Sequence, residues 1–338
     1  MFEWMFRRQE HWSGSGYSFA VAFADGNPIG QLGGVPFHFN RFGESGTGIW
    51  TANWSIKPEA RKGATAIELL LEFQRRDMQL VMLFGMNPML HPIMKGIKYH
   101  TVESLPRFWI VFEDRREEFR RLMAQSYPDW SQSRIDQLTR RLTVLPPVSA
   151  RPDVVRNIPR DWDDTTWKIL SGRMVGAART AEYLQWRYAE HPVYDYRFVT
   201  IENDDGPGLA VWRREEIEQK AANNLGAVGR IMEILAPTSR CAQSLIGCLC
   251  ADLWASDVFA ADYMGYSGEA GEALLGSGFK LVETETDGAM IPCRFQPIDT
   301  KMTTLHSAIS LLGDGPDSKY DANCPWIWTK GDGDMDRP

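Results

Sequence analysis

The stretch IKPEARKGATAIELLLEF, residues 56–73, decides how the first half of the chain folds. A strand is expected to end within the first residues of this stretch, and a helix is expected to start near Lys62. The turn between them contains Gly63 together with the small residues Ala64 and Ala66. The first N–H groups of a helix have no partner within it, and small side chains leave them open to a ligand. The turn is therefore either an ordinary helix start or a seat for a phosphate.

The segments on both sides of this turn predict a βαβ unit. Residues 49–56 are rich in aromatic and β-branched side chains, which favour a strand. In the helix that follows, Ile67, Leu70 and Leu71 share one face. Residues 80–84, LVMLF, form a continuous apolar run that is typical of a strand covered on both faces. Strand, helix and strand in this order predict a parallel pair joined by a crossover helix.

The rest of the chain predicts two copies of one α/β unit. A hairpin turn at residues 25–27 and strand-like runs at 29–32 and 35–39 precede the βαβ unit. The second half repeats the order, with strands expected at 196–201, 209–212, 230–235 and 258–263 and a helix at about 241–254. The short segments 94–98 and 275–280 also match, since each follows a short helix and precedes a strand. We predict a first domain at 1–112, a helical linker at 113–150, and a second domain at 151–338.

Composition narrows the class of protein. The chain has 338 residues, 43% of them hydrophobic, which suits two domains with a core in each. Its formal net charge of −7 disfavours nucleic acid as the main partner, because neutralising phosphates requires a basic face. Five cysteines without a CxxC pair predict neither a disulfide framework nor a zinc site.

The sequence predicts neither a secretory signal nor a membrane helix. The N-terminal residues lack the long apolar region of a secretory signal. No stretch reaches the roughly 20 apolar residues that a membrane helix needs. The cysteine usage fits a reducing compartment. We therefore expect a cytoplasmic protein without membrane insertion. The sequence leaves the oligomeric state open.

Hairpin strands, a βαβ unit with a small-residue turn, and a helix that ends in Gly-hydrophobic resemble the GNAT acyltransferase superfamily. The family pattern is Arg/Gln-x-x-Gly-x-Gly/Ala, and residues 61–66, RKGATA, are the ungapped match. Ala64 stands where the family has its first glycine. The resemblance implies an α/β fold with α+β mixed sheets: two tandem GNAT-like domains, each a twisted mixed sheet flanked by helices.

The resemblance also implies acyl-coenzyme A (acetyl-CoA or a longer acyl-CoA) as co-substrate, with no metal. In the family the turn holds the pyrophosphate of the coenzyme, and the pantetheine arm lies between the two diverging strands, here residues 53–56 and 81–84. An Asn is common after the second strand. The implied coenzyme-binding residues are Trp54, Ser55, Ile56, Arg61, Lys62, Gly63, Ala64, Thr65, Ala66 and Asn87.

The residue that moves the proton is less clearly marked. The family often places a Tyr acid four residues before the Gly-hydrophobic pair, and Pro92 stands there in this chain. His91 is adjacent and is a candidate proton shuttle, although a lone His is also common as a helix cap or surface residue. Tyr99 is the second candidate. The chemistry requires alignment of an amine with the thioester in a ternary complex, and a dedicated base helps but is not obligatory.

The second half is expected to shape the acceptor pocket. Its equivalent turn at residues 236–241 has no glycine, and Pro237 removes an N–H group, so no second coenzyme site is expected there. Tyr183, Trp186, Arg187 and His191 are candidates for binding the acceptor, because Arg beside aromatic rings suits a sugar ring and a phosphate. The alternative is a helix packed on its own sheet.

The aspartates near the C-terminus are a second candidate acceptor site. Residues 326–328 are expected to form a last strand, which would place Asp332 and Asp334 at a strand end, where they could hold an amine or hydroxyls. The alternative is an acidic tail. The stretch lacks the twelve-residue series with a closing Glu that a calcium loop requires.

The chain as a whole looks like the two-GNAT-unit transferases found with surface-polysaccharide synthesis. That resemblance implies an acyltransferase of the EC 2.3.1 type that acts on the amine of an amino sugar, nucleotide-linked, by direct attack. Two alternatives stay open. One is a Fem-like transferase that uses aminoacyl-tRNA, which the acidic balance disfavours. The other is a non-catalytic GNAT-like binding protein, which the substitution at Ala64 and the missing Tyr keep open.

Overall fold

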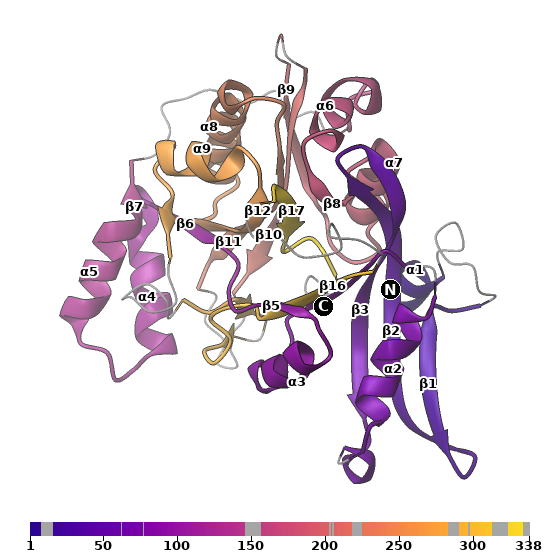
Figure 1. Cartoon of the computed structure of the whole chain (residues 1–338). Helices are drawn as coiled ribbons and strands as arrows, with labels where there is room; N and C mark the ends of the chain where they lie inside the picture. The colour runs from indigo at the N-terminus through magenta and orange to yellow at the C-terminus, as the bar shows by residue number, and fades with distance from the viewer. Residues whose placement is uncertain are drawn as a thin grey trace.

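A large mixed β-sheet forms the frame of the molecule in the computed structural model (Figure 1). The structure describes residues 1–7, 16–61, 63–76, 78–145, 157–202, 204, 206–217, 225–282, 291–296, 298–312 and 324–333. Within these residues the main path of the sheet runs β5-β16-β4-β3-β2-β8-β17-β12-β11-β10-β9. Helices flank this sheet, and the α/β fold class expected from the sequence is confirmed.

The first half contains the predicted hairpin and βαβ unit. Its elements in chain order are β1 (Phe19–Ala24), β2 (Asn27–Arg41), β3 (Glu44–Ile56), α2 (Thr65–Gln74), β4 (Leu80–Phe84), α3 (His91–Gly96) and β5 (His100–Val102). Strands β1, β2 and β3 pair antiparallel, and β3 pairs parallel with β4. The runs at 29–32 and 35–39 belong to one strand, β2. Helix α2 buries Leu69, Leu70 and Phe73.

The second half repeats these elements and their pairing. They are β9 (Arg197–Ile201), β10 (Gly208–Glu216), β11 (Ala227–Leu235), α8 (Ser239–Ala255), β12 (Ala260–Ser267), α9 (Ala270–Gly276) and β13 (Lys280–Leu281). Strands β9, β10 and β11 pair antiparallel, and β11 pairs parallel with β12. Helix α8 is longer than α2 and buries an apolar side against the sheet.

The turns after α3 and α9 also correspond. The N–H of Tyr99 donates to the carbonyl of Met94 at 2.9 Å, and the N–H of Phe279 donates to that of Leu274 at 3.0 Å. In both turns the residue before the aromatic one has a positive φ, 67° at Lys98 and 97° at Gly278. The match between 94–98 and 275–280 in the sequence therefore reflects a shared backbone turn.

Two strands cross from one half to the other. Strand β6 (Arg107–Phe112) follows the first half in sequence but pairs with β12 and β13. Strand β16 (Ser307–Leu311) comes late in the chain but pairs with β4 and β5. β6 has the same neighbours in the second half as β16 has in the first half. Each half therefore supplies one strand to the other. β6 thus lies within the range predicted for the first domain but in the sheet of the second half.

A second connection joins the two halves near the middle of the sheet. Strand β17 (Trp326–Thr329) pairs antiparallel with the end of β12 and parallel with β8 (Val175–Ala177). β8 in turn pairs with the end of β2. The main sheet is continuous for this reason, and β17 brings the C-terminal residues to its centre (Figure 1).

The segment expected as a helical linker forms two helices, α4 (Arg116–Ser126) and α5 (Gln132–Leu142). Their apolar side chains pack in one cluster with Trp109, Val228 and Phe259, so the helices cover a face of the second half. Figure 1 shows them at the edge of the molecule beside β6.

The remaining elements are short. They are α1 (Phe2–Phe6), η2 (Pro58–Ala60), η3 (Pro88–Leu90), η4 (Glu113–Arg115), β7 (Thr143–Val144), η5 (Asp163–Trp167), α6 (Lys168–Ser171), α7 (Ala181–Leu184), η6 (Gln185–Ala189), β14 (Arg294–Phe295) and β15 (Ile298–Asp299). Across the described segments, no helix combines the length and the apolarity that crossing a membrane requires.

Candidate active site

Strand β3 continues well beyond the end of its ladder with β4. Their parallel ladder runs from Gly48 opposite Leu80 to Thr51 opposite Leu83. Just beyond it, Asn53 has a φ of 52°, and the pairing of β3 with β2 shifts register at this point. An extra residue in one strand bends that strand. The last residues of β3 and the end of β4 therefore present strand edges that no longer bond to each other.

The start of α2 lies just after the diverging end of β3. Its N-cap residue, Ala64, offers no side-chain hydrogen bond, and the first helical bond runs from Glu68 N–H to Ala64 O at 2.9 Å. The N–H groups of Thr65, Ala66 and Ile67 precede that bond, so the helix itself does not satisfy them. Such a helix start is positively polarised and favours an anion. Gly63 and Ala64 are exposed, which leaves this turn open to solvent.

The other predicted coenzyme residues surround this turn. The exposed Arg61 donates from Nε to the carbonyl of Ile56 at 3.1 Å, which ties the turn to the strand end. Trp54 and Ile56 are half-buried against the core of the first half, and Ser55 is exposed. Asn87 caps η3, because its Oδ1 accepts from the N–H of Met89 at 2.9 Å. Lys62 lies outside the described residues.

The equivalent helix start in the second half is capped by a side chain. Thr238 is the N-cap of α8, and its side chain accepts from the N–H of Cys241 at 3.2 Å. The carbonyl of Pro237 accepts from Arg173 Nη1 at 3.1 Å. Of these two equivalent helix starts in the described chain, that of α2 lacks a side-chain cap and that of α8 has one.

His91 contacts a second histidine from the far end of the chain. Its Nε2 lies 3.0 Å from Nδ1 of His306, the residue before β16, and the two rings are nearly perpendicular at 86°. Burial and the neighbouring His91 both lower the pKa of His306. A contact between two imidazole nitrogens requires one to donate and one to accept. No sequence pattern indicates this pair, because 215 residues separate its members.

Tyr99 lies in the interior of the first half. It is 3% exposed and belongs to the core cluster that also contains Leu70 and Met94. Burial raises the pKa of its hydroxyl well above the ordinary value. The structure thus keeps Tyr99 protonated and away from solvent.

The predicted acceptor residues of the second half lie together but make internal contacts. Arg187 is buried and donates from Nε to Gly331 O at 2.8 Å and from Nη2 to Gly333 O at 3.2 Å. Trp186 stacks on Trp4 with ring centroids 4.8 Å apart. The buried His191 accepts at Nδ1 from the N–H of Tyr194 at 2.9 Å. Of these residues, Arg187 is the one whose printed contacts hold the turn that follows β17.

A buried charge network lies beside this turn. Asp332 Oδ2 accepts from Arg179 Nη2 at 2.9 Å, and Arg179 Nε lies 3.0 Å from Oε1 of Glu233. The hydroxyl of Tyr188 donates to the same Glu233 oxygen at 2.6 Å. Tyr183 packs against the guanidinium of Arg179, whose Cζ lies 5.0 Å from the ring centroid. Two carboxylates thus share one arginine in the interior. Asp334 lies outside the described residues.

Each carboxylate of this network has one oxygen that no hydrogen bond from the described residues reaches. These atoms are Oε2 of Glu233 and Oδ1 of Asp332. Burial raises the pKa of Glu233, the nearby Asp332 adds to the rise, and Arg179 opposes it. A buried carboxylate with a raised pKa and an unused oxygen has the properties of a general base or acid. The signal in the sequence was a charged residue inside the apolar run IMEIL, residues 231–235.

The network adjoins the place where β3 and β4 separate. A Cβ built on Gly333 would lie 3.4 Å from Cβ of Phe84, the last residue of β4. The rings of Phe84 and Trp328 are 5.8 Å apart, and those of Trp50 and Tyr183 are 6.2 Å apart. The open strand pair of one half and the carboxylates of the other therefore meet. Within the described residues no group of three or more His, Cys, Asp or Glu side chains is arranged to hold a metal.

Comparison with solved structures identifies the fold. N-myristoyltransferase of Saccharomyces cerevisiae with bound myristoyl-CoA aligns with a TM-score of 0.52 at 10% identity, covering 92% of this chain and 78% of that one. Another structure of this enzyme with myristoyl-CoA gives 0.51 at 9% identity, with 90% and 74% covered. A GCN5-related N-acetyltransferase from Anabaena variabilis gives 0.47 at 12%, with 90% and 66% covered. No family model and no curated protein matches the sequence.

The class is therefore defined by fold. The chain has the GNAT fold, as the sequence resemblance implied, and shares it with N-myristoyltransferase across most of its length.

Proposed function

We propose that the protein is an acyl-CoA-dependent N-acyltransferase that moves an acyl group from a thioester to an amine. The observation that carries the proposal is a single juxtaposition. Strands β3 and β4 separate next to the uncapped start of α2, and the buried carboxylates of Glu233 and Asp332 adjoin the same strand ends. One side suits a thioester donor and the other suits removal of a proton from an amine.

The first half would hold the coenzyme. The N–H groups of Thr65 and Ala66, with the neighbouring Gly63 and Ala64, would receive the pyrophosphate, and Arg61 would add positive charge. The edge of β3 around Trp54 and Ser55 would pair with the pantetheine amides, since an exposed strand edge accepts an added strand. Lys62 and Asn87 complete the set proposed from the sequence.

The reaction would proceed by direct attack in a ternary complex. The amine must be neutral to attack, so a base must accept its proton. We assign this role to Glu233, because its pKa is raised and its Oε2 is unused. Arg179 and Asp332 would then hold Glu233 in place. The pair His91–His306 is the alternative route for the proton, as His91 was proposed from the sequence. Tyr99, the second candidate from the sequence, lies in the core of the first half.

For the acceptor we propose an amino sugar, nucleotide-linked, as the sequence resemblance implies. Tyr183 contacts Arg179 of the carboxylate network, and Arg187 bonds to the turn that carries Asp332. Trp186 stacks on Trp4, and His191 accepts from the N–H of Tyr194. Arg187 would therefore act on the acceptor pocket through that turn, and Tyr183 would act on it through the network. A cytoplasmic location fits soluble substrates of this kind.

A thermal-shift series followed by a thiol-release assay tests the proposal. Acetyl-CoA and longer acyl-CoAs should each be compared with coenzyme-free protein, with nucleotide-linked amino sugars and with tRNA. Stabilisation by acyl-CoA, and release of free thiol only when an amine is added, are expected. Stabilisation by tRNA instead would favour a Fem-like transferase. Stabilisation by acyl-CoA without thiol release across the amine panel would favour a non-catalytic binding protein.

A further inference from the structure

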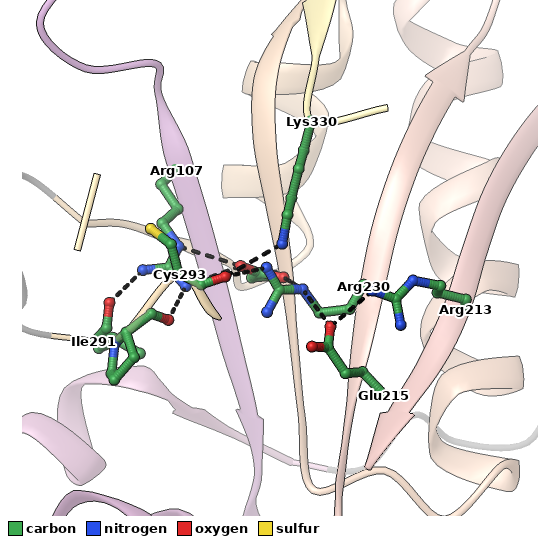
Figure 2. Close-up of polar contacts among 9 residues, drawn as sticks. Arg107, Arg213, Glu215, Arg230, Ile291, Cys293 and Lys330 are labelled. Carbon is green, nitrogen blue, oxygen red and sulfur yellow. Dashed lines mark hydrogen bonds and ion pairs between the residues drawn. The ribbon is translucent and has the colours of Figure 1, made fainter. Parts of the chain in front are cut away.

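A second buried charge cluster lies in the same half as Glu233, and the proposed chemistry does not use it (Figure 2). Its members come from β6, β10, β11, β12 and the residue after β17, and each is at most 6% exposed. They are Arg107, Arg213, Glu215, Arg230, Asp262 and Lys330.

Each carboxylate of this cluster serves two arginines. Asp262 contacts Arg107 through Oδ2 at 3.0 Å and Arg230 through Oδ1 at 2.8 Å. Glu215 Oε2 lies 3.1 Å from Arg213 Nη2 and 3.6 Å from Arg230 Nε. The described part of the cluster therefore holds four cationic side chains and two carboxylates. An excess of buried positive charge is costly unless an anion or strong acceptors compensate it.

Two of the cations converge on one atom. Arg230 Nη2 donates to the carbonyl of Cys293 at 2.9 Å, and Lys330 Nζ donates to the same oxygen at 3.3 Å (Figure 2). Arg107 holds the two preceding carbonyls, those of Ile291 and Pro292. Nη1 of Arg230 has no hydrogen-bond partner in the part of the chain that the structure describes, although the side chain is fully buried. An unpaired guanidinium N–H in the interior, beside an ammonium group without a carboxylate partner in the described residues, is suited to bind an oxyanion.

A bulge places this cluster on the same face of β11 as Glu233. The register between β10 and β11 shifts by one residue where Val211 pairs with Glu233 and Trp212 pairs with Ile231. Ile231 and Ile234 pack on the α8 side, whereas Met232 joins the opposite cluster together with Tyr188, the partner of Glu233. Arg230 and Glu233 are three residues apart, so their Cα atoms are separated by roughly 10 Å along the strand.

We propose that Arg230 and Lys330, supported by Arg107 and Arg213, bind a phosphate group of the acceptor. This inference rests on the proposed acyltransferase function and narrows its substrate class. The acceptor is a small amine that carries a phosphate or diphosphate, and the span between its phosphate and its reacting nitrogen corresponds to the spacing of Arg230 and Glu233 on β11. The phosphate grip that the sequence suggested for Arg187 belongs instead to Arg230 and Lys330, since Arg187 is engaged with the carbonyls of Gly331 and Gly333.

The first test measures anion binding by the full chain without coenzyme. Inorganic phosphate and diphosphate are titrated at constant ionic strength, with chloride as the reference salt, and thermal unfolding is followed. Stabilisation of the wild type is expected. Lys330→Met should weaken the apparent affinity by about tenfold or more, since it removes a charged hydrogen-bond donor from the site. Lys280→Met, at an exposed lysine of the same half, is the matched control and should bind as the wild type does.

The second test separates a bound substrate group from a free anion. A phosphorylated amine, an amino sugar phosphate, is compared with its dephosphorylated form in equilibrium binding. Tighter binding of the phosphorylated form, lost in Lys330→Met and in the conservative Arg230→Lys, supports the assignment. Equal binding of the two forms, or phosphate stabilisation that persists in both variants, overturns it.

Acyl-CoA stabilisation is measured in the same variants, so the two proposals fail separately. Lys330→Met that still binds acyl-CoA but shows no phosphate effect supports the anion site. Absence of any effect of phosphate, diphosphate and the phosphorylated amine on a wild type that binds acyl-CoA overturns the anion site alone. Failure of the wild type to bind any acyl-CoA overturns the proposed function, while the phosphate titration still decides whether the cluster binds anions.

Discussion

Glu233 and Asp332 share the guanidinium of Arg179, at 3.0 Å and 2.9 Å, although 99 residues of sequence separate the two carboxylates. One comes from the middle of β11 and the other from the turn after β17. One positive charge between two buried carboxylates leaves the cluster short of a cation, which favours protonation of one of them. Burial and Asp332 accordingly raise the pKa of Glu233.

Replacement of Glu233 by Gln should abolish most acyl transfer. A positioned general base contributes about 10²- to 10⁴-fold to a rate, so we expect a fall of that order in kcat. Binding of acyl-CoA should persist, because Glu233 lies in the other half. Thiol release and coenzyme binding by calorimetry measure the two effects. Glu44→Gln, at an exposed position, is the control, and a Glu233→Gln enzyme of normal kcat would exclude Glu233 as the base.

The pH dependence of the reaction rate should also reveal Glu233 as the base. Glu233 accepts a proton only when ionised, and its pKa is raised from the ordinary 4.5. The rate should therefore rise with pH through an acid limb that lies above the usual range for Glu. The stability contribution has the opposite sign, because a carboxyl with a raised pKa destabilises the folded state as pH rises through that pKa. Glu233→Gln should flatten both profiles, as recorded by rate and urea unfolding from pH 4 upward.

Charge reversal at Arg61 should weaken coenzyme binding without unfolding the protein. The side chain is exposed at the turn before α2, so we expect a loss of a few-fold, about 1 kcal/mol or less, in acyl-CoA affinity. The loss should shrink at high salt. The matched control is Arg240→Glu, at the start of α8 in the second copy. Equal losses in both variants would show a general charge effect and would place the coenzyme elsewhere.

Substitution of Arg187 distinguishes structural support of the turn after β17 from direct binding of the acceptor. Its removal would leave the carbonyls of Gly331 and Gly333 without their buried donors. Each unsatisfied buried group costs about 1–3 kcal/mol, so Arg187→Met should lower the free energy of unfolding by about 3 kcal/mol. Urea denaturation measures the change, with Arg187→Lys as the conservative comparison. A variant of unchanged stability that loses only acceptor affinity would restore Arg187 as a direct contact.

The histidine pair should make stability depend on pH in the neutral range. Burial, followed by the neighbouring His91, lowers the pKa of His306 below its ordinary 6.5. A histidine with a lowered pKa stabilises the fold above the unfolded pKa, and this contribution is lost as pH falls toward the folded pKa. His306→Gln should therefore reduce the decline in stability between pH 7 and pH 5, measured by urea unfolding at each pH. His38→Gln, at an exposed histidine, should leave the decline unchanged.

Local patterns in the sequence predicted the elements that local physics determines. The apolar run at 80–84, the helical face of Leu70 and the turn at Gly63 gave the βαβ unit, whose helix begins at Thr65. The repeat of short segments gave the second copy. The candidate coenzyme turn could also be proposed from the sequence, because a helix start and the strand before it are adjacent in sequence.

The carboxylate network and the exchanged strands were beyond such patterns. Arg179, Glu233 and Asp332 meet only because β8, β17, β12 and β11 follow one another across the sheet, and no periodicity encodes that order. The functional interpretation of Arg187 from sequence relied on residue type alone, and burial decided what its donors contact. His306 likewise acquires His91 as a neighbour only after β16 joins the first half.

The exchange of β6 and β16 has a consequence for synthesis on the ribosome. The first half lacks the strand between β4 and β5 until residues 307–311 have been made, so the edge of β4 stays unpaired while most of the chain emerges. Unpaired strand edges of this kind invite aggregation during synthesis. The coenzyme half, although it precedes β16 by more than 200 residues, therefore cannot complete its sheet before residue 311 has been translated.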